Sequence, residues 1–528
     1  MARTNPPASP APDVRPPEPG TPYAALCAHL RESALLESAA HLASWDQETY
    51  MPAQGAAARA ETASILAGLV HERRTSPRLG ELLATCEGDK GLQGDEVARA
   101  NLREMRRDYD RLTKLPKDLV AEIAKTTSEA QEVWKKARAD NNFALFRPWL
   151  EQVVVLMRRK AECLGFREGG ESYDALLDLY EPEATAAQIE AVFTPLRARL
   201  SDLIGRVRES GAKVSTKCLD VKVPAERQHA FGLFVLRAMG FDLEGGRLDT
   251  TAHPFCSGIA PGDVRLTTRY RDERFTDALY GTMHEAGHGL YEQGLFKRTP
   301  DGGVSAYFGT PLADSVSLGI HESQSRMWEN FVGRSKGFWK WALPHSRKFF
   351  GKALDKWDHK DLFAATNTVT PSFIRVEADE TTYNLHVMIR FEMERAILRG
   401  DIAVGEIPAE WNRRYKEYLG VKVPDDRRGC LQDVHWSLGL FGYFPTYTLG
   451  NLYAAQFWER IQHDLPDLPK QIAKGKFGGL KAWLNEHIHA PGRRYTAGAL
   501  CERVTGQALS HDALLRHLEH KAEQVYGV

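Results

Sequence analysis

Two histidines, His284 and His288, lie four residues apart in the stretch YGTMHEAGHGLYEQG (280–294). On a helix such residues are one turn apart, so both imidazoles can approach a single metal ion. At 3.6 residues per turn, Glu285 is rotated by about 100° from His284 and by about 60° from His288. The stretch therefore predicts a zinc ion held by two histidines, with a carboxylate beside it that can accept a proton from a metal-bound water.

A solvated helix face would tolerate the same three residues, but two local features argue for burial. Few charged residues lie between 278 and 291, and an apolar stripe follows the helical period: Leu279, Met283, Ala286 and Leu290. Three glycines each cost about 1 kcal/mol relative to alanine within a helix, which indicates close approach by another element. They are Gly281, Gly287 and Gly289.

A catalytic zinc usually has three protein ligands and one open position. Glu292 lies about 12 Å along the helix axis from His284, at 1.5 Å per residue, so one straight helix cannot supply all three ligands. Glu322 follows His288 by 34 residues and stands in a second predicted helix, SLGIHESQSRMWENF (317–331). We expect Glu322 to be the third ligand, the alternative being a surface carboxylate. We expect His321 to support the site or pack in the core.

The composition limits the function classes. The 528 residues are 43% hydrophobic, which is enough to bury one very large core or several smaller ones. The chain holds 69 Lys and Arg against 70 Asp and Glu, so it has no basic excess for a nucleic-acid partner. The seven scattered cysteines form no C-x-x-C pair, which predicts a reducing compartment and no cysteine-zinc site.

The N-terminal segment 1–22 contains eight prolines. Because proline removes backbone donors and favours extended chain, we expect a disordered tail there. No apolar segment follows the first basic residues, and no apolar run reaches the roughly 20 residues that cross a bilayer. We therefore expect a cytoplasmic protein with no signal peptide and no membrane partner.

The remaining chain is dominated by helical periodicity. Clear examples are 23–45, 96–112, 145–165 and 186–210, the last preceded by Thr185 and ending near Gly211. DVRLTTRY (263–270) alternates like a strand after a Pro-Gly turn, and VSAYFGT (304–310) is a weaker candidate. We expect a single, mainly helical domain over residues 23–528, with a small sheet near the active site.

Several segments in order resemble the carboxypeptidase Taq family of zinc metallocarboxypeptidases. The six main motifs are HPF (253–255), DVRLTT (263–268), HEAGH (284–288), HESQ (321–324), IRVEAD (374–379) and GCLQDVHW (429–436). WDQETYMP (45–52), GYFPTYTLGN (442–451) and APGRRYTAGALCERVTG (490–506) also look like the family. The resemblance runs from about residue 23 to the end, without a departure at the core motif positions. The Pro-rich tail has no counterpart.

The resemblance implies a nearly all-α metallopeptidase fold with a long, deep substrate groove, a catalytic zinc at its floor and a homodimeric assembly. It places the zinc ligands at His284, His288 and Glu322, and the catalytic carboxylate at Glu285. The implied reaction is release of C-terminal amino acids from peptides by attack of a zinc-bound water. Apart from the resemblance, we consider Co²⁺ as a substitute for the zinc.

Such a reaction forms an oxyanion, which needs a hydrogen-bond donor opposite the glutamate. We expect His435 and Tyr447 to supply it. His435 could instead be a core histidine held by Asp433 or Gln432, and Tyr443 is an equal rival of Tyr447.

Recognition of a free C-terminal carboxylate calls for a planar, bidentate donor. Arg375 is the first choice, with a helix-type pair to Asp379 as its structural alternative. Arg265 is the second choice, unless Asp263 merely braces it. His253 could line the substrate groove or serve a structural role.

Two further interpretations concern the substrate and the activity. The strand 263–270 could dock an extended peptide by edge pairing. An endo-acting zinc oligopeptidase of similar helical fold is the nearest rival. A peptide-binding scaffold that keeps zinc without turnover is disfavoured, because such a site has no use for Glu285.

Overall fold

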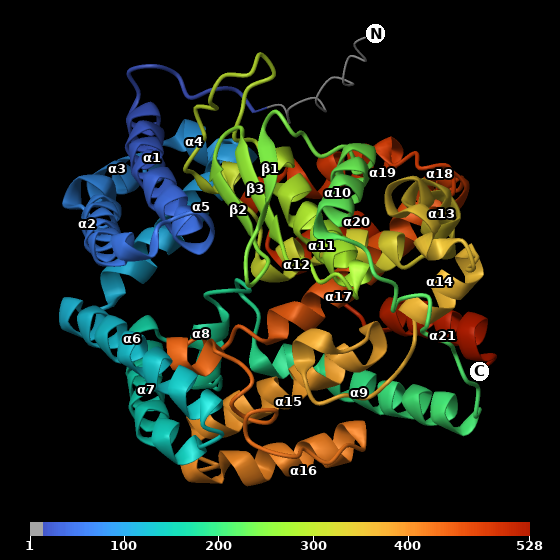
Figure 1. Ribbon diagram of the computed structural model, residues 1–528. Coiled ribbons are helices and arrows are strands. Elements are labelled where there is room, and N and C mark those ends of the chain that lie inside the picture. Colours follow the sequence, from blue (N-terminus) through green and yellow to red (C-terminus); the bar gives the residue numbers. More distant parts are fainter. Residues whose placement is uncertain (1–13) are drawn as a thin grey trace.

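The computed structural model describes residues 14–528 and confirms a mainly helical architecture (Figure 1). The helices before the sheet are α1 (Pro22–Thr49), α2 (Ala56–Arg74), α3 (Pro77–Glu87), α4 (Lys90–Gly94), α5 (Glu96–Lys114), α6 (Lys117–Ala139), α7 (Phe143–Leu164), α8 (Ser172–Leu177), α9 (Ala186–Glu209) and α10 (Ala225–Met239). The helices after it are α11 (Phe275–Gly294), α12 (Leu318–Arg326), α13 (Lys336–Phe350), α14 (His359–Thr366), α15 (Glu380–Arg399), α16 (Ile407–Leu419), α17 (Pro445–Asp464), α18 (Leu468–Ile472), α19 (Gly478–Leu484), α20 (Ala497–Thr505) and α21 (Asp512–Tyr526).

The predicted helices are confirmed as α1, α5, α7 and α9. Helix α9 begins where its capping chemistry dictates, because Thr185 and Gln188 form a reciprocal capping box. The helix predicted over 317–331 is also present. It changes after Arg326 from α-helix to a π-helical segment, η3 (Met327–Gly333).

The small sheet has three strands, β1 (Gly246–Thr250), β2 (Cys256–Ala260) and β3 (Asp263–Thr268), in the order β1-β3-β2. Strand β3 pairs in parallel with β1 and antiparallel with β2, so both of its edges are occupied. The predicted docking of a peptide on the edge of 263–270 is therefore wrong. The strand predicted over 304–310 is also wrong, because Val304 makes only an isolated bridge to Arg298 and turns follow it.

The buried apolar residues form two clusters. The larger one extends from Leu119 to Ala522 and includes the buried side of α11. The smaller one is built by α1, α3 and α5 together with Tyr307 and Leu312 from the long α11–α12 connection. The single domain over 23–528 stays a prediction.

The predicted disordered tail lies partly outside the described residues, since residues 1–13 are not among them. Residues 14–21 are described; most of them are exposed, and two contacts tie this part to the body. Val14 contacts the smaller cluster, and the Arg15 carbonyl accepts a hydrogen bond of 2.6 Å from the Tyr307 hydroxyl. Among the helices within residues 14–528, none has the length and apolar composition that crossing a bilayer requires.

The central helices position the site. Figure 1 shows α11 next to the sheet, with α12 and α17 close to it. Helix α11 packs on β3 and on α12, and α12 packs on α17. Segments distant in sequence therefore meet around α11.

Candidate metal centre

Helix α11 carries His284, Glu285 and His288 and is buried along most of its length, as predicted. The four residues of its apolar stripe are all buried. The two imidazoles lie on one side of the helix, with ring centroids 4.9 Å apart.

Two glycines allow helices to approach closely at this point. A Cβ on Gly287 would lie 2.4 Å from the Gln324 carbonyl oxygen and 2.5 Å from the Ser325 Cα, both on α12. On the other side of α12, a Cβ on Gly450 of α17 would lie 2.5 Å from the Glu322 Cγ. Helix α12 is thus confined between α11 and α17, and this confinement fixes the Glu322 side chain.

Glu322 completes a three-atom donor set. Its Oε2 lies 3.6 Å from the His284 Nε2 and 3.4 Å from the His288 Nε2. One donor atom from each of the three residues lies within 4.8 Å of the others. Two imidazole nitrogens and one carboxylate oxygen suit a catalytic zinc and leave a coordination position free, so these residues fit a divalent metal.

Glu292, which the helix geometry excludes as a ligand, has other partners. Its Oε1 lies 3.0 Å from the His321 Nε2, and its Oε2 accepts a hydrogen bond of 2.5 Å from the Lys297 Nζ. His321 in turn places its Nδ1 2.5 Å from the Nδ1 of His288. His321 therefore contacts a metal-ligand candidate, as expected, and does not join the donor set.

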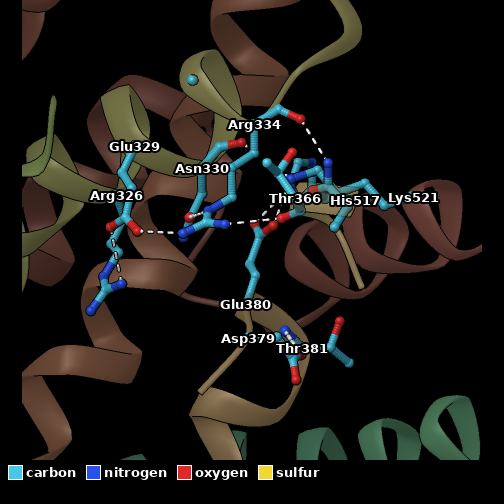
Figure 2. Close-up of polar contacts among 12 residues, drawn as sticks. Arg326, Glu329, Asn330, Arg334, Thr366, Asp379, Glu380, Thr381, His517 and Lys521 are labelled. Atoms are coloured by element: carbon cyan, nitrogen blue, oxygen red, sulfur yellow. Dashed lines mark hydrogen bonds and ion pairs between the residues drawn. The ribbon is translucent and has the colours of Figure 1, made fainter. Parts of the chain in front are cut away.

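Glu329 contacts the His284 ring nitrogen that does not belong to the donor set. The His284 Nδ1 lies 3.0 Å from the Glu329 Oε2, so the Nε2 is left for a metal. Figure 2 shows Glu329 between Arg326 and Arg334, whose guanidinium groups donate to it at 3.2 and 3.0 Å. Arg326 also donates from Nε to the Glu322 Oε1 at 2.7 Å. One arginine thus orients both carboxylates.

Burial and neighbouring charges set the protonation states of the four central residues. Burial, reinforced by Glu322, raises the pKa of Glu285 to about 7. Burial alone would raise the pKa of Glu322, but Arg326 and His284 outweigh it and hold that pKa well below its ordinary value. Burial lowers the pKa of His288 to about 4. Burial also disfavours charge on His284, but Glu322 and Glu329 outweigh it and raise its pKa to about 8.

His435 and Tyr447, the predicted oxyanion donors, lie together. His435 begins the short 3₁₀ segment η7 (His435–Leu438), Tyr447 stands in the first turn of α17, and the His435 Nε2 lies 3.3 Å from the Tyr447 hydroxyl. Burial, then Arg375, lowers the pKa of His435 to about 3, and burial holds the pKa of Tyr447 well above its ordinary value. The rival Tyr443 packs beside Tyr447, with centroids 5.5 Å apart.

Neither Asp433 nor Gln432, the partners that the structural alternative named, holds His435. Asp433 accepts from Arg375 and Arg390 instead, and Gln432 bonds to backbone groups. The His435 Nδ1 is buried and has no hydrogen-bond partner among residues 14–528. A free polar atom at this point is available to a ligand.

Tyr383 connects this pair to the metal-ligand candidates. The Arg326 guanidinium lies over the Tyr383 ring at 4.5 Å from its centroid. The Arg375 Nη1 donates to the Tyr383 hydroxyl at 3.0 Å, and Arg375 lies over the Tyr447 ring at 4.8 Å. The structure therefore brings Arg375, Tyr447 and the Glu322 region into one continuous group.

Arg375 pairs with Asp433 and not with Asp379, the partner that its structural alternative required. Its Nε and Nη2 donate to the Asp433 Oδ1 at 3.1 and 2.9 Å, while Asp379 caps the N-terminus of α15. The structural alternative, an Arg375–Asp379 pair, is therefore wrong, because Asp379 uses its carboxylate to accept backbone N–H groups at the helix start.

Arg265 and His253 lie apart from these contacts. Arg265 makes a two-bond pair with Asp263, at 2.8 Å for each bond, and its guanidinium lies over the Trp45 ring at 4.2 Å. Asp263 thus braces Arg265. The His253 side chain is exposed.

Sequence reasoning missed the residues that hold the ligands. Arg326 and Glu329 follow Glu322 by four and seven residues in the predicted helix 317–331. That spacing returns to the same helix face, so it was a usable signal. Arg334 lies beyond the predicted helix, and nothing local marks it.

A cavity of about 440 Å³ lies elsewhere, between α9, α15 and α16. Its four arginines all pair with acidic side chains: Arg197, Arg395, Arg399 and Arg414. Such a balanced wall presents no unpaired charge to a ligand, whereas the candidate metal donors lie together on α11 and α12.

The fold and this donor set define the class of the protein as a helical metallopeptidase. Comparison with known proteins narrows the class. The chain belongs to the carboxypeptidase Taq (M32) metallopeptidase family, whose family model matches residues 25–522. It is therefore a metallocarboxypeptidase, a hydrolase that acts on peptides.

Curated relatives and solved structures are similar to this chain over almost its whole length. Thermostable carboxypeptidase 1 of Thermus thermophilus is 45% identical, over 96% of this chain and 100% of its own. Carboxypeptidase 1 of Bacillus subtilis is 37% identical, over 94% and 97%. The crystal structure of the M32 carboxypeptidase from Deinococcus radiodurans has a TM-score of 0.91 at 39% identity, and covers 96% of this chain and 100% of its own.

Proposed function

We propose that the metal is zinc, held by His284, His288 and Glu322, and that the enzyme releases single amino acids from the C-terminus of peptides. The observation that supports this most is the donor set, with two Nε2 atoms and one carboxylate oxygen within 4.8 Å. Each histidine also has its Nδ1 engaged by another side chain, as metal-ligating imidazoles usually do. Cobalt suits the same donors.

Glu285 is the proposed general base. When bound, zinc lowers the pKa of a coordinated water toward 7 and polarises the scissile carbonyl. The Glu285 carboxylate accepts the proton of the attacking water and then delivers it to the leaving amine. A neutral His435 ring has one N–H and the Tyr447 phenol has one O–H, so one of them donates to the oxyanion while the other serves the 3.3 Å contact between the two residues.

Arg375 is the proposed clamp for the C-terminal carboxylate of the substrate. Of its five N–H groups, Asp433 and Tyr383 accept three among the described residues. One N–H on each terminal nitrogen is left, and such a pair can hold a carboxylate in two bonds. Arg265 is the second choice, and His253 is proposed to line the substrate groove.

The test of the base is Glu285→Gln. This variant keeps the shape of the side chain but removes the base, so zinc content stays near one per chain while the rate falls by about 10²–10⁴. Metal analysis and single-substrate kinetics measure both quantities. Near-normal turnover with zinc present would refute the role of Glu285.

The test of the reaction is a peptide with a blocked N-terminus, followed by mass spectrometry. Successive loss of single residues from the C-terminus is the expected result. Internal fragments would identify an endo-acting oligopeptidase instead.

We also propose a homodimer in the cytoplasm, as the family resemblance implies. Helix α2 has no buried residue, and it packs beside α1. Four large apolar side chains on the two helices are 41–64% exposed: Leu35, Leu42, Ile65 and Leu69. A second copy of the chain would cover them. Sedimentation of the wild type against Ile65→Glu/Leu69→Glu tests this, with a monomeric variant as the expected result and an equally dimeric variant as the contrary one.

The proposed cytoplasmic location is supported by seven cysteines that form no disulfide. Cell fractionation with activity measurement tests it.

A further inference from the structure

The two histidine ligands proposed above have different outer partners. His284 contacts a carboxylate directly, through Glu329 at 3.0 Å. His288 instead contacts another imidazole, because the His321 Nδ1 lies 2.5 Å from its own Nδ1. His321 follows with its Nε2 at 3.0 Å from the Glu292 Oε1. A carboxylate therefore reaches His288 only through a second histidine.

The chemistry of the rings fixes the direction of these hydrogen bonds. A neutral imidazole that binds a metal through Nε2 carries its proton on Nδ1, so His288 is the donor at the 2.5 Å contact. The His321 Nδ1 is then the acceptor, and the His321 proton lies on Nε2. That proton points to the Glu292 Oε1, which accepts the hydrogen bond.

Glu292 is held in place as an anion. Lys297 donates to it at 2.5 Å, and both side chains are largely buried, with 12% and 17% of their side-chain areas exposed. A Cβ on Gly258 of β2 would lie 2.2 Å from the Glu292 Oε2, so β2 packs directly on the carboxylate. The acceptor at the end of the chain therefore has a fixed position and a fixed charge.

We propose that His321 and Glu292 are positioning residues for His288, and that they orient its imidazole and fix the proton on Nδ1 so that Nε2 is free for the metal. This inference rests on the proposed metal-binding function. Both nitrogens of His321 are engaged, so His321 acts through His288 and does not bind the metal itself. Loss of such an outer partner typically weakens metal binding by about 10–100-fold.

The chain offers a matched control in His489. His321 and His489 pack on the same ring, Tyr291, with centroid distances of 5.1 and 4.9 Å. Both nitrogens of His489 also have partners, at 2.7 Å to Asn485 and 2.8 Å to Gln324. His489 contacts none of the three ligand candidates by these bonds. The same substitution at both positions separates lost packing from lost positioning.

The experiment measures the Zn²⁺ dissociation constant of the full chain by competition with a chromophoric chelator, and the visible spectrum of the Co²⁺-loaded protein. His321→Leu should bind Zn²⁺ about 10–100-fold more weakly and change the Co²⁺ spectrum. His321→Gln retains one acceptor and one donor, so it should recover most of the affinity. His489→Leu should lower the unfolding temperature and leave both metal readouts unchanged.

Wild-type affinity in His321→Leu would overturn the inference and leave the zinc site intact. An equal loss in His489→Leu, or no recovery in His321→Gln, would also overturn it. A wild-type protein that binds no Zn²⁺ would overturn the proposed function together with this inference.

Discussion

Gly287 controls the distance between α11 and α12, and Gly287→Ala is expected to separate them. The added Cβ would lie 2.4 Å from the Gln324 carbonyl oxygen and 2.5 Å from the Ser325 Cα. Both atoms belong to the backbone, so no side-chain rotation relieves the overlap. Because real Cβ contacts almost never fall under 3.0 Å, the α12 backbone must move by at least 0.6 Å, the difference between 3.0 and 2.4 Å.

Two opposing effects determine the change in stability. Alanine is favoured over glycine within a helix by about 1 kcal/mol. Overpacking of a closely packed contact costs about 1–3 kcal/mol. Because the added Cβ overlaps backbone atoms, the overpacking cost of Gly287→Ala lies near the top of that range. We therefore expect a net loss of about 1–2 kcal/mol in the free energy of unfolding.

The same movement of α12 is also expected to weaken metal binding. Metal–ligand distances tolerate deviations of about 0.2 Å, and α12 carries Glu322 away from the two histidines as it moves. We expect Zn²⁺ affinity to fall by about 10–100-fold, as when the support of a ligand is lost.

Two other glycines of α11 serve as controls. A Cβ on Gly281 would lie 3.4 Å from the Thr268 Oγ1, an ordinary contact, so Gly281→Ala should keep Zn²⁺ affinity and gain up to about 1 kcal/mol. A Cβ on Gly289 would lie 2.7 Å from the Leu266 Cδ2, so Gly289→Ala should lose stability on the sheet side and keep the metal. Urea unfolding of the metal-free proteins and chelator competition provide both measurements. If Gly287→Ala matches Gly281→Ala in unfolding free energy and in Zn²⁺ affinity, Gly287 does not control the distance between α11 and α12.

Three further results are expected. Glu322→Ala leaves two imidazoles and should lose its zinc on dialysis; full retention, by metal analysis, would assign the third ligand to another residue. Because neighbouring carboxylates raise the pKa of His284 to about 8 after the opposing effect of burial, protons compete with the metal below that pH. Zn²⁺ affinity should therefore fall as pH decreases from 8, by about tenfold per pH unit in a chelator titration, and a flat profile would contradict this. Arg375→Lys replaces a fork by a point charge, so peptides ending in a free acid should lose about 1–3 kcal/mol in transition-state binding, while amidated peptides change little. An unchanged ratio of kcat/KM for acid and amide substrates, with folding and zinc intact, would move the clamp to Arg265 or favour endo-acting cleavage.

Local patterns in the sequence were enough for the helices that it predicted and for half of the site. The capping chemistry of Thr185 located the start of α9. The four-residue spacing placed His284 and His288 on one side of α11, because helical periodicity depends only on neighbouring residues. The glycines of that helix predicted a close neighbour, and Gly287 meets the backbone of α12.

Predictions that needed a distant partner were less reliable. Arg375 pairs with Asp433, 58 residues away, instead of its helical neighbour Asp379. Strand β3 has no free edge, because two five-residue strands with weak patterns pair with both of its sides. Short strands are stabilised by partners that the local sequence does not specify.

The sequence alone therefore determined that a buried helix carries the site. It also determined that this helix presents two histidines and a glutamate close together. Only the tertiary structure decided the rest: that Glu322 faces both histidines, that Glu329 and His321 hold their outer nitrogens, and that Glu292 is directed elsewhere. The physical reason is that a helix fixes the relative positions of side chains within a few turns through local backbone bonds. The third ligand instead depends on how closely α11, α12 and α17 pack, and that distance is set by contacts between residues far apart in the chain.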